Sequence, residues 1–123
     1  MDKEQTLQAF FESFGWKAYD ENKLPDDAEM PRITYGLATD SLGQPISIAI
    51  SLWDKSFSWA SVTQKAHEIG RAIMLMHPPA IKCDEGRIYI NPGTPFTQRM
   101  NEPSDDFIRR LYINLEIEFF TAY

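Results

Sequence analysis

The chain has 123 residues and a formal net charge of -6, and 43% of its residues are hydrophobic. This length is that of one domain, so we expect a single domain over residues 1–123. The lone cysteine, Cys83, excludes an internal disulfide and favours a reducing compartment. The negative charge argues against a protein that grips the phosphates of a nucleic-acid duplex, although such a charge is also ordinary for solubility.

A membrane-spanning helix needs about 18 consecutive apolar residues, and no run in the chain approaches that length. The first residues, MDKEQTLQAFF, are acidic and amphipathic, whereas a secretory signal begins with basic residues followed by an apolar block. We therefore expect a soluble protein that is made in the cytoplasm and has no membrane partner.

The first predicted element is a helix over residues 2–14. Asp2 is a natural N-cap, Gly15 stands where a helix ends, and apolar side chains recur at helical spacing. This apolar stripe consists of Leu7, Phe10, Phe11 and Phe14. Residues 16–31 contain two prolines and several acids without a regular period, and this pattern predicts a long surface loop.

Two strands are predicted next, in RITYGLATD and QPISIAISLWD, joined as a hairpin by Ser-Leu-Gly. Each strand alternates between large apolar residues and small residues. The small-residue face could let another surface approach closely, or it could be an ordinary exposed face of residues with high β-propensity. Its members are Thr34, Gly36, Ala38, Ser47, Ala49 and Ser51.

A second helix is predicted over residues 58–76, with Ser58 as its cap and the sequence HPP as its end. Its buried stripe is expected to contain Trp59, Val62, Ala66, Ile69, Ile73 and Met76. A short hairpin follows, in which IKCD and RIYIN are joined by the dipeptide EG, because glycine supplies the positive φ of a tight turn.

Residues 91–107 are predicted to form a second long loop that carries prolines and charges, whereas a simple connection needs about 2 to 6 residues. The final strand lies in IRRLYINLEIEFFTAY and alternates strictly between an apolar and a polar face. Its apolar face contains Leu111, Ile113, Leu115, Ile117 and Phe119, and its polar face contains Arg110, Tyr112, Asn114, Glu116 and Glu118.

The predicted order of elements is α-β-β-α-β-β-β. Because each strand has one apolar face and each helix one apolar stripe, the economical packing places both helices on the apolar side of one sheet. We therefore expect an α+β fold with an antiparallel sheet of about four to five strands and two helices packed on one face.

No motif in the chain predicts catalysis. The sequence AHEIGR places Arg71 where a zinc hydrolase helix needs its second histidine, so His67 is expected to be an ordinary helix residue. His77, Cys83 and Asp84 lie close in sequence without the spacing of metal ligands, and INPGTP lacks the lysine of a phosphate loop. We therefore expect a protein that is not an enzyme, with no catalytic, cofactor-binding or metal-binding residues.

The charges of the second long loop suggest an assembly contact instead. They alternate in sign along the chain as Arg99, Asp105, Asp106, Arg109 and Arg110. Arginines of one copy could pair with acids of the next copy in a ring, or the two aspartates could be solvated turn residues before the strand. The remaining candidate interface residues are Trp53, Glu116 and Glu118.

Most of the chain, from about residue 16 to residue 119, resembles tail terminator or tail-to-head joining proteins of long-tailed bacteriophages and prophages. The resemblance is carried by PRITYGLATDSLGQPISIAISLWDKSFSW, by GRIYI and by GTPFTQRMNEPSDDFIRRLYINLEIEF. It rests on this overall run of residues, and it fixes no catalytic or contact residue individually.

The resemblance implies a subunit that forms a ring, expected to be a hexamer, at the head-proximal end of the tail tube. Such a ring ends tube growth and joins tail to head, so its partners would be copies of itself, the tail tube protein and a head-completion or neck protein. DNA would pass through its channel without specific binding, and the mature location would be the virion.

Two alternatives to the terminator stay open. One is another small virion component, such as a neck adaptor or a different minor tail protein. The other is a cytosolic binding module that captures a peptide along the last strand or on the small-residue face.

Overall fold

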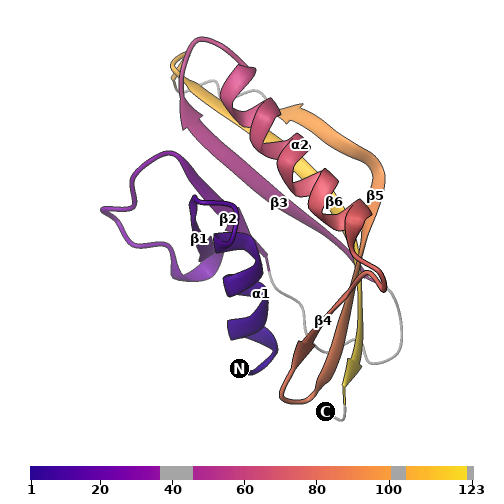
Figure 1. The fold of residues 1–123 in the computed structure, drawn as a ribbon. Coiled ribbons are helices and arrows are strands. Elements are labelled where there is room, and N and C mark those ends of the chain that lie inside the picture. Colours follow the sequence, from indigo (N-terminus) through magenta and orange to yellow (C-terminus); the bar gives the residue numbers. More distant parts are fainter. Residues whose placement is uncertain (37–45, 101–104, 122–123) are drawn as a thin grey trace.

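The computed structural model describes residues 1–36, 46–100 and 105–121 (Figure 1). It is an α+β fold in which one curled, mixed sheet of six strands packs against two helices. In chain order the elements are α1 (Lys3–Glu12), β1 (Lys17–Asp20), the 3-10 turn η1 (Glu21–Lys23), β2 (Arg32–Tyr35), β3 (Ile46–Lys55), α2 (Ala60–Leu75), β4 (Ala80–Cys83), β5 (Gly86–Met100) and β6 (Ile108–Thr121).

The strands lie in the order β1-β2-β3-β6-β5-β4, and β1 pairs with β2 in parallel while all other neighbours are antiparallel. The expectation of four to five antiparallel strands is confirmed in part: the predicted strands, β2 to β6, pair antiparallel, but the sheet has a sixth strand that runs parallel to its neighbour. The additional strand, β1, lies inside residues 16–31, which were predicted to be loop. It forms because its backbone pairs with β2 and because Ala18 is buried in the core.

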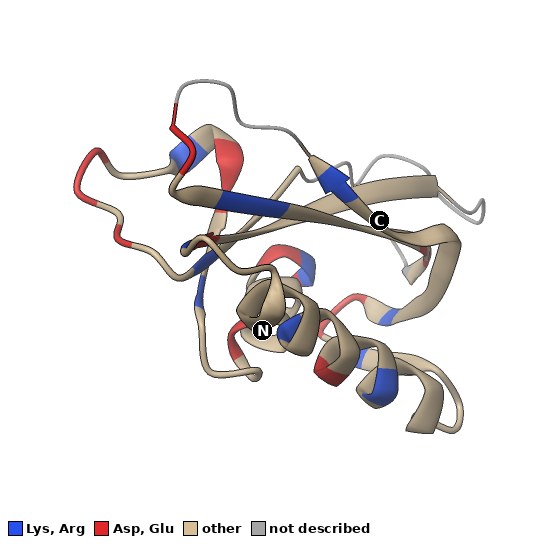
Figure 2. Ribbon diagram, turned by 90° about the horizontal axis from the view of Figure 1, so that it is seen from above, with Lys and Arg blue, Asp and Glu red and all other residues tan. Residues whose placement is uncertain are grey.

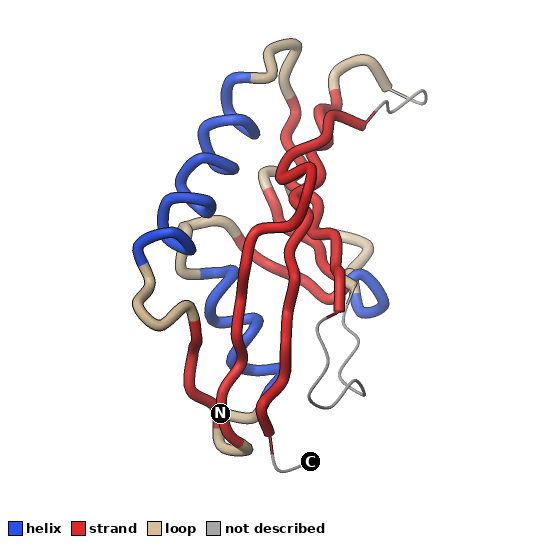
Figure 3. The backbone as a smooth tube through the Cα atoms, turned by 90° about the vertical axis from the view of Figure 1, so that its right-hand side faces the viewer, coloured by secondary structure: helices blue, strands red, loops and turns tan. Residues whose placement is uncertain are grey.

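Both helices cover the same face of the sheet, as predicted (Figures 2 and 3). The predicted stripes of the two helices and the apolar side of β6 meet there in one hydrophobic cluster. Its fully buried large side chains are Leu7, Phe11, Ile33, Ile50, Leu52, Ile69, Ile88, Ile90, Ile113, Leu115, Ile117 and Phe119. Burial of this apolar surface is the main source of stability.

The ends of both helices follow from local residues. Asp2 caps α1 by accepting a hydrogen bond from the N–H of Gln5, whose side chain bonds back to the cap, and Gly15 follows the helix with a φ of 93°. Helix α2 is shorter than predicted, and its N-cap is Trp59, which makes no side-chain cap hydrogen bond, so the prediction of Ser58 as the cap was wrong. Ser58 lies two residues before its first helical residue, Ala60, and its Oγ accepts a hydrogen bond from the Ala60 N–H at 3.0 Å.

The second predicted loop was largely wrong, because β5 continues along residues 91–107 as far as Met100 and pairs with β6. The pairing shifts register between Pro92 and Thr97, which is where a strand tolerates proline. Residues 101–104 lie outside the described residues. What remains of the predicted loop is a turn that precedes β6.

Contacts with β6 on one side and with α2 on the other stabilise this bulge. The Nδ2 of Asn114 donates a hydrogen bond to the backbone oxygen of Pro95 at 2.7 Å. A Cβ on Gly93 would lie 2.9 Å from the backbone oxygen of Asn114, so the two strands approach closely only because residue 93 is glycine. Phe96 packs against Gly70 of α2, where a Cβ would meet the ring at 2.9 Å. The bulge thereby bends β5 over the helix.

The two predicted hairpins are present. Strands β2 and β3 pair antiparallel, although residues 37–45, which include the predicted turn and Ala38, lie outside the described residues. Strands β4 and β5 pair around Gly86, which has a φ of 150°. The last strand, β6, is paired on both sides by β3 and β5. Along Ile108–Ile117 β6 therefore has no free edge for a peptide strand, which argues against that part of the binding-module alternative over these residues.

Burial of Tyr35 predicts a change of stability at high pH. Burial raises the pKa of its phenol from 10.0 to about 12. The folded protein therefore binds this proton more tightly than the unfolded chain, so the contribution is complete below pH 10 and is lost as the pH rises through 12. We expect the wild type to lose more unfolding free energy than Tyr35→Phe over this interval. Urea unfolding of both proteins from neutral pH to pH 12 measures the difference, and parallel curves would contradict it.

Candidate functional site

Four of the six arginines gather at one end of the sheet, where β3 ends and β6 begins. We call this group, Arg32, Arg99, Arg109 and Arg110, the basic end. Successive residues of a strand point to opposite faces. Arg110 therefore lies on the sheet face opposite the helices, and Arg109 lies on the helix side.

On the sheet face opposite the helices, two arginines of the basic end stack on Trp53. It stands directly opposite Arg110 in the β3–β6 register, and the Arg110 guanidinium lies 4.3 Å from the Trp53 ring centroid and 4.6 Å from that of Tyr112. The guanidinium of Arg32 lies 5.2 Å from the Trp53 ring centroid. The indole N–H donates to Thr34 Oγ1 at 2.9 Å, which fixes the ring. One indole thus positions two cations.

Hydrogen bonds fix the direction of both guanidinium groups. Arg110 Nε donates to Ser51 Oγ at 3.2 Å, and Arg32 Nη1 donates to the backbone oxygen of Ala28 at 3.0 Å. The Nε of Arg32 is buried without a hydrogen-bond partner among the described residues. Burial lowers the pKa of Arg32, because the charged form loses part of its hydration.

On the helix side of the sheet, the other two arginines of the basic end stack on Trp59. Its ring centroid lies 4.8 Å from the guanidinium of Arg99 and 5.3 Å from that of Arg109. Arg109 also donates from Nη2 to the backbone oxygen of Phe57 and from Nη1 to that of Asp106, both at 2.9 Å. Arg109 therefore ties the start of β6 to the segment before α2.

Two exposed phenylalanines lie beside this cluster. The rings of Phe57 and Phe107 are 4.7 Å apart, and the residues are 72% and 41% exposed. Their segments are joined by a hydrogen bond from the Ser56 N–H to the Phe107 carbonyl at 2.8 Å. An apolar pair in water beside stacked arginines has the composition of a protein-binding hot spot.

The structure brings together some of the predicted interface residues. Trp53 lies against Arg110, and Arg99 lies beside Arg109 at Trp59. Among the described residues the carboxylates of Asp105 and Asp106 form no ion pair with these arginines, and Arg109 bonds only the backbone oxygen of Asp106. Asp105 accepts a hydrogen bond from the Phe107 N–H at 2.8 Å. Within residues 1–36, 46–100 and 105–121 the basic end has no ion pair with a carboxylate. Inside one chain, the aspartates thus fit the alternative of solvated turn residues.

Glu116 and Glu118 lie far from the basic end. They follow Arg110 by six and eight positions along β6, which is a separation of about 20 Å or more. They line a pocket of about 480 Å³ together with Tyr89, Asn91, Ile117 and Phe120. The predicted site is therefore divided between two ends of the sheet.

Sequence reasoning missed Arg32, Tyr112, Phe57 and Phe107 as site residues, and it assigned Trp59 only to the helix stripe. The available signal was the alternation of β3 and β6, which places Trp53 and Arg110 on one face once the register is known. The register itself depends on the pairing of distant segments, and the sequence alone does not supply it.

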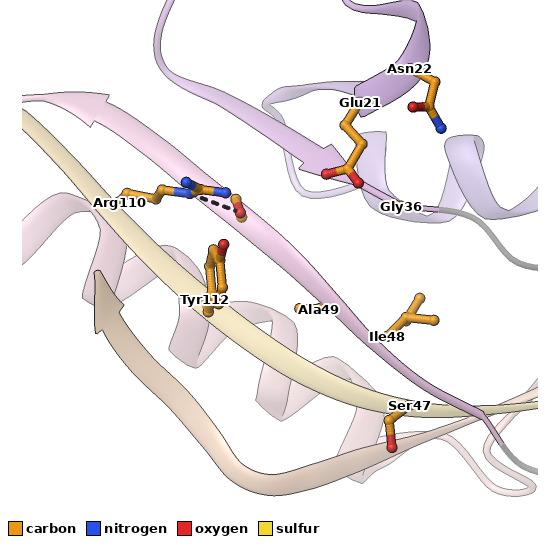
Figure 4. Close-up of a pocket in the computed structure, with 9 residues that line it drawn as sticks. Glu21, Asn22, Gly36, Ser47, Ile48, Ala49, Arg110 and Tyr112 are labelled. Carbon is orange, nitrogen blue, oxygen red and sulfur yellow. Dashed lines mark hydrogen bonds between the residues drawn. The ribbon is translucent and has the colours of Figure 1, made fainter. Parts of the chain in front are cut away.

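The small-residue face forms the floor of a pocket of about 410 Å³ (Figure 4). Gly36, Ser47, Ala49 and Ser51 are short enough to leave this space, and Arg110, Tyr112, Glu21 and Asn22 stand around it. Thr34 and Ser51 are buried, whereas Ser47 and Ala49 are exposed. The face is thus a shallow depression with a cation at one end.

The residues that the sequence analysis considered for catalysis or metal binding lie outside the basic end. His67 and His77 are exposed, and Cys83 is a half-buried residue of β4. In the part of the chain that the structure describes, no group of three or more His, Cys, Asp or Glu side chains could hold a metal ion. Neither of the described helices is long and apolar enough to cross a membrane.

Three comparisons with known proteins found nothing similar. No protein-family model matches the chain, and no curated protein or solved structure matches it.

The stacking of Arg110 on Trp53 predicts a measurable coupling energy. A double-mutant cycle with Trp53→Leu, Arg110→Met and the double variant should give a coupling of about 0.5 to 2 kcal/mol in unfolding free energy, because a partly buried cation–π contact has this size. Chemical denaturation of the four proteins measures it. A control cycle that pairs Trp53→Leu with the distant Arg87→Met should give no coupling, and equal values in both cycles would contradict the prediction.

Proposed function

We propose that this protein is a structural assembly subunit of a long-tailed phage or prophage, which forms a ring that ends the tail tube and joins it to the head. Its partners are copies of itself, the tail tube protein and a head-completion or neck protein. The resemblance described above supports the specific role, and a hexamer is the ring size that it suggests.

The observation that carries an assembly role is the composition of the basic end. Phe57 and Phe107 expose their rings to water beside Arg99 and Arg109, whose guanidinium groups are already oriented by Trp59. Aromatic and arginine side chains dominate the energy of protein interfaces, and side chains that are fixed in advance lose less entropy on binding.

Open sheet edges support the same role. Strand β1 is the outermost strand on one side of the sheet, and beyond Ile90, β5 pairs with β6 alone among the described strands. Unpaired edges of this kind accept a strand or loop from a neighbour. The net charge of -6 suits a channel through which DNA passes, because a negative wall repels phosphates.

The test is electron microscopy of particles from a phage or induced prophage that lacks this gene. We expect filled heads beside unattached tails, with tails of abnormal length, and complementation by the wild-type gene should restore joined particles. Intact infectious particles would overturn the proposal. Joined heads and tails of normal length with another defect would indicate a different small virion component.

The open edge of β5 favours a second candidate, a cytosolic module that binds an extended peptide from a host protein. Such a protein would stay monomeric and would be missing from purified particles. Mass spectrometry of purified particles separates the two candidates, because a terminator is retained at a fixed copy number.

A further inference from the structure

Three cations gather on the sheet face opposite the helices, which we call the open face, at the end where β3 finishes. Arg32 and Arg110 stack on Trp53, and Lys55 follows Trp53 by two positions along β3, which places it on the same face. We call Arg32, Lys55 and Arg110 the basic corner. In the part of the chain that the structure describes, none of the three forms an ion pair with a carboxylate.

Hydrogen bonds hold both guanidinium groups of the basic corner in fixed directions. Arg110 Nε donates to Ser51 Oγ at 3.2 Å, and Arg32 Nη1 donates to the backbone oxygen of Ala28 at 3.0 Å. The Nε of Arg32 is buried and finds no hydrogen-bond partner among the described residues, and burial lowers the pKa of this arginine. A cation that has lost hydration and lacks a counterion is stabilised strongly by an anion.

The acidic residues that flank the basic corner form no ion pair with it. Asp27 and Glu29 are exposed and line a pocket beside β1. Asp54 belongs to the helix side of β3 by the alternation of that strand. Glu21 stands across the depression of the small-residue face (Figure 4). An acidic ligand is repelled by Glu21 over the depression, so its anionic groups belong at the basic corner.

The spacing of the two arginines favours a ligand with two anionic groups. Arg32 lies on β2 and Arg110 on β6, and Trp53 stands on β3 between them. Their guanidinium groups lie 5.2 Å and 4.3 Å from the Trp53 ring centroid, so the two charges are less than about 10 Å apart, which is within the Debye length at about 0.1 M salt. In an extended peptide, alternate side chains point the same way at a spacing of about 7 Å.

We propose that the basic corner binds an extended acidic segment of a partner protein, in which two carboxylates are two positions apart. One carboxylate pairs with Arg110 and the other with Arg32, because a guanidinium binds a carboxylate through two parallel hydrogen bonds. The depression of about 410 Å³ beside Arg110 leaves room for the rest of the segment. This inference rests on the proposed assembly role and names the chemistry of a partner in it.

Other anions fit the basic corner less well. A single strand of nucleic acid binds by stacking its bases on aromatic rings, but the rings of Trp53 and Tyr112 already carry guanidinium groups. The net charge of -6 also repels a chain of phosphates. A single small oxyanion reaches only one of the two arginines, since the strand that carries Trp53 separates them.

The experiment measures the binding of a labelled peptide to the purified full-length protein by fluorescence anisotropy at low salt. The peptide carries two glutamates separated by one serine. One control peptide has the two glutamates adjacent, and another has glutamines in their place. We expect the alternating peptide to bind about threefold tighter than the adjacent one and about tenfold tighter than the glutamine one, because only the alternating peptide presents both carboxylates to one face.

Variants of the protein locate the bound peptide. Arg110→Met and Arg32→Met should each weaken binding about fivefold or more, and Glu21→Gln should tighten it about twofold by removing an opposing charge. Arg87→Met, which removes an exposed arginine at the distant end of β5, should bind like the wild type. Each variant is checked for the wild-type melting curve. Lys55→Met changes an exposed side chain and should weaken binding about twofold, so it serves where an arginine variant fails to fold.

Several results would overturn the inference. These are no binding of the alternating peptide at millimolar protein, or arginine variants that bind it like the wild type. Displacement of the peptide by an equal concentration of inorganic phosphate would indicate a site for one small oxyanion instead. Tighter binding of oligothymidylate would indicate a nucleic-acid surface. The measurement uses no particles, so a negative result leaves the terminator proposal standing, and the gene-deletion phenotype tests that proposal separately.

Discussion

Replacing Ile113 by alanine is expected to destabilise the fold by about 2 to 5 kcal/mol. Ile113 lies at the middle of β6, is 0% exposed, and sits between Ile50 of β3 and Thr97 of β5 in the register. Truncation leaves a cavity that the paired strands cannot close, because both neighbours are fixed by the sheet ladder. Since domains are stable by only about 5 to 15 kcal/mol, the change would remove a large share of the total.

Chemical denaturation measures this loss as a lower midpoint with an unchanged slope. Glu116→Ala is the matched control, because Glu116 lies on the same strand and is exposed on the opposite face. The control should change the unfolding free energy by no more than about 0.5 kcal/mol. Equal effects of the two variants would mean that β6 does not bury its predicted apolar face.

The sequence predicted the buried face of β6 correctly because the pattern that marks it is local. The alternation in β6 and the helical spacing in α2 are repeated over many residues, so each pattern selects one structure and one buried side without knowledge of the rest of the chain. The buried residues Val62, Ala66, Ile69 and Ile73 of α2 belong to the predicted stripe. The same reasoning predicted the cap of α1, since Asp2 acts within a few residues, but it failed for α2, whose N-cap is Trp59.

The errors concern elements that depend on distant partners. The sequence KAYD is too short to show a period, and it is a strand because β2 lies beside it in parallel. Pro92 and Pro95 predict a loop, yet a bulge at a free edge accommodates both prolines within β5. In each case the tertiary position overrides the local propensity.

The candidate site shows the same division. Arg99, Arg109 and Arg110 stood out in the sequence as charges of the predicted loop and of the start of the last strand, and Trp53 was a further candidate interface residue. That they stack in two clusters on opposite faces, one around Trp53 and one around Trp59, follows from the β3–β6 register and from the way α2 begins.

Arg99→Glu is expected to have the largest effect on particle assembly. Arg99 is exposed and its side chain stacks on Trp59, so its reversal should leave the unfolding free energy within about 1 kcal/mol of the wild type. In the ring that we propose, with the basic end at the contact between subunits, the same change would place a negative charge at every contact. A like-charge contact costs several kcal/mol, and every 1.4 kcal/mol is a tenfold change in affinity.

We therefore expect a gene with Arg99→Glu to fail to complement the deletion, with infectious particles reduced at least a hundredfold and unattached tails visible by electron microscopy. Arg109 is a poorer choice for this test, because its hydrogen bonds to Phe57 and Asp106 would be lost together with its charge. Arg71→Glu carries the same charge change on the exposed side of α2 and should complement fully. If Arg99→Glu complements as well as Arg71→Glu, the basic end does not take part in assembly, and the exposed Phe57–Phe107 pair needs a different partner.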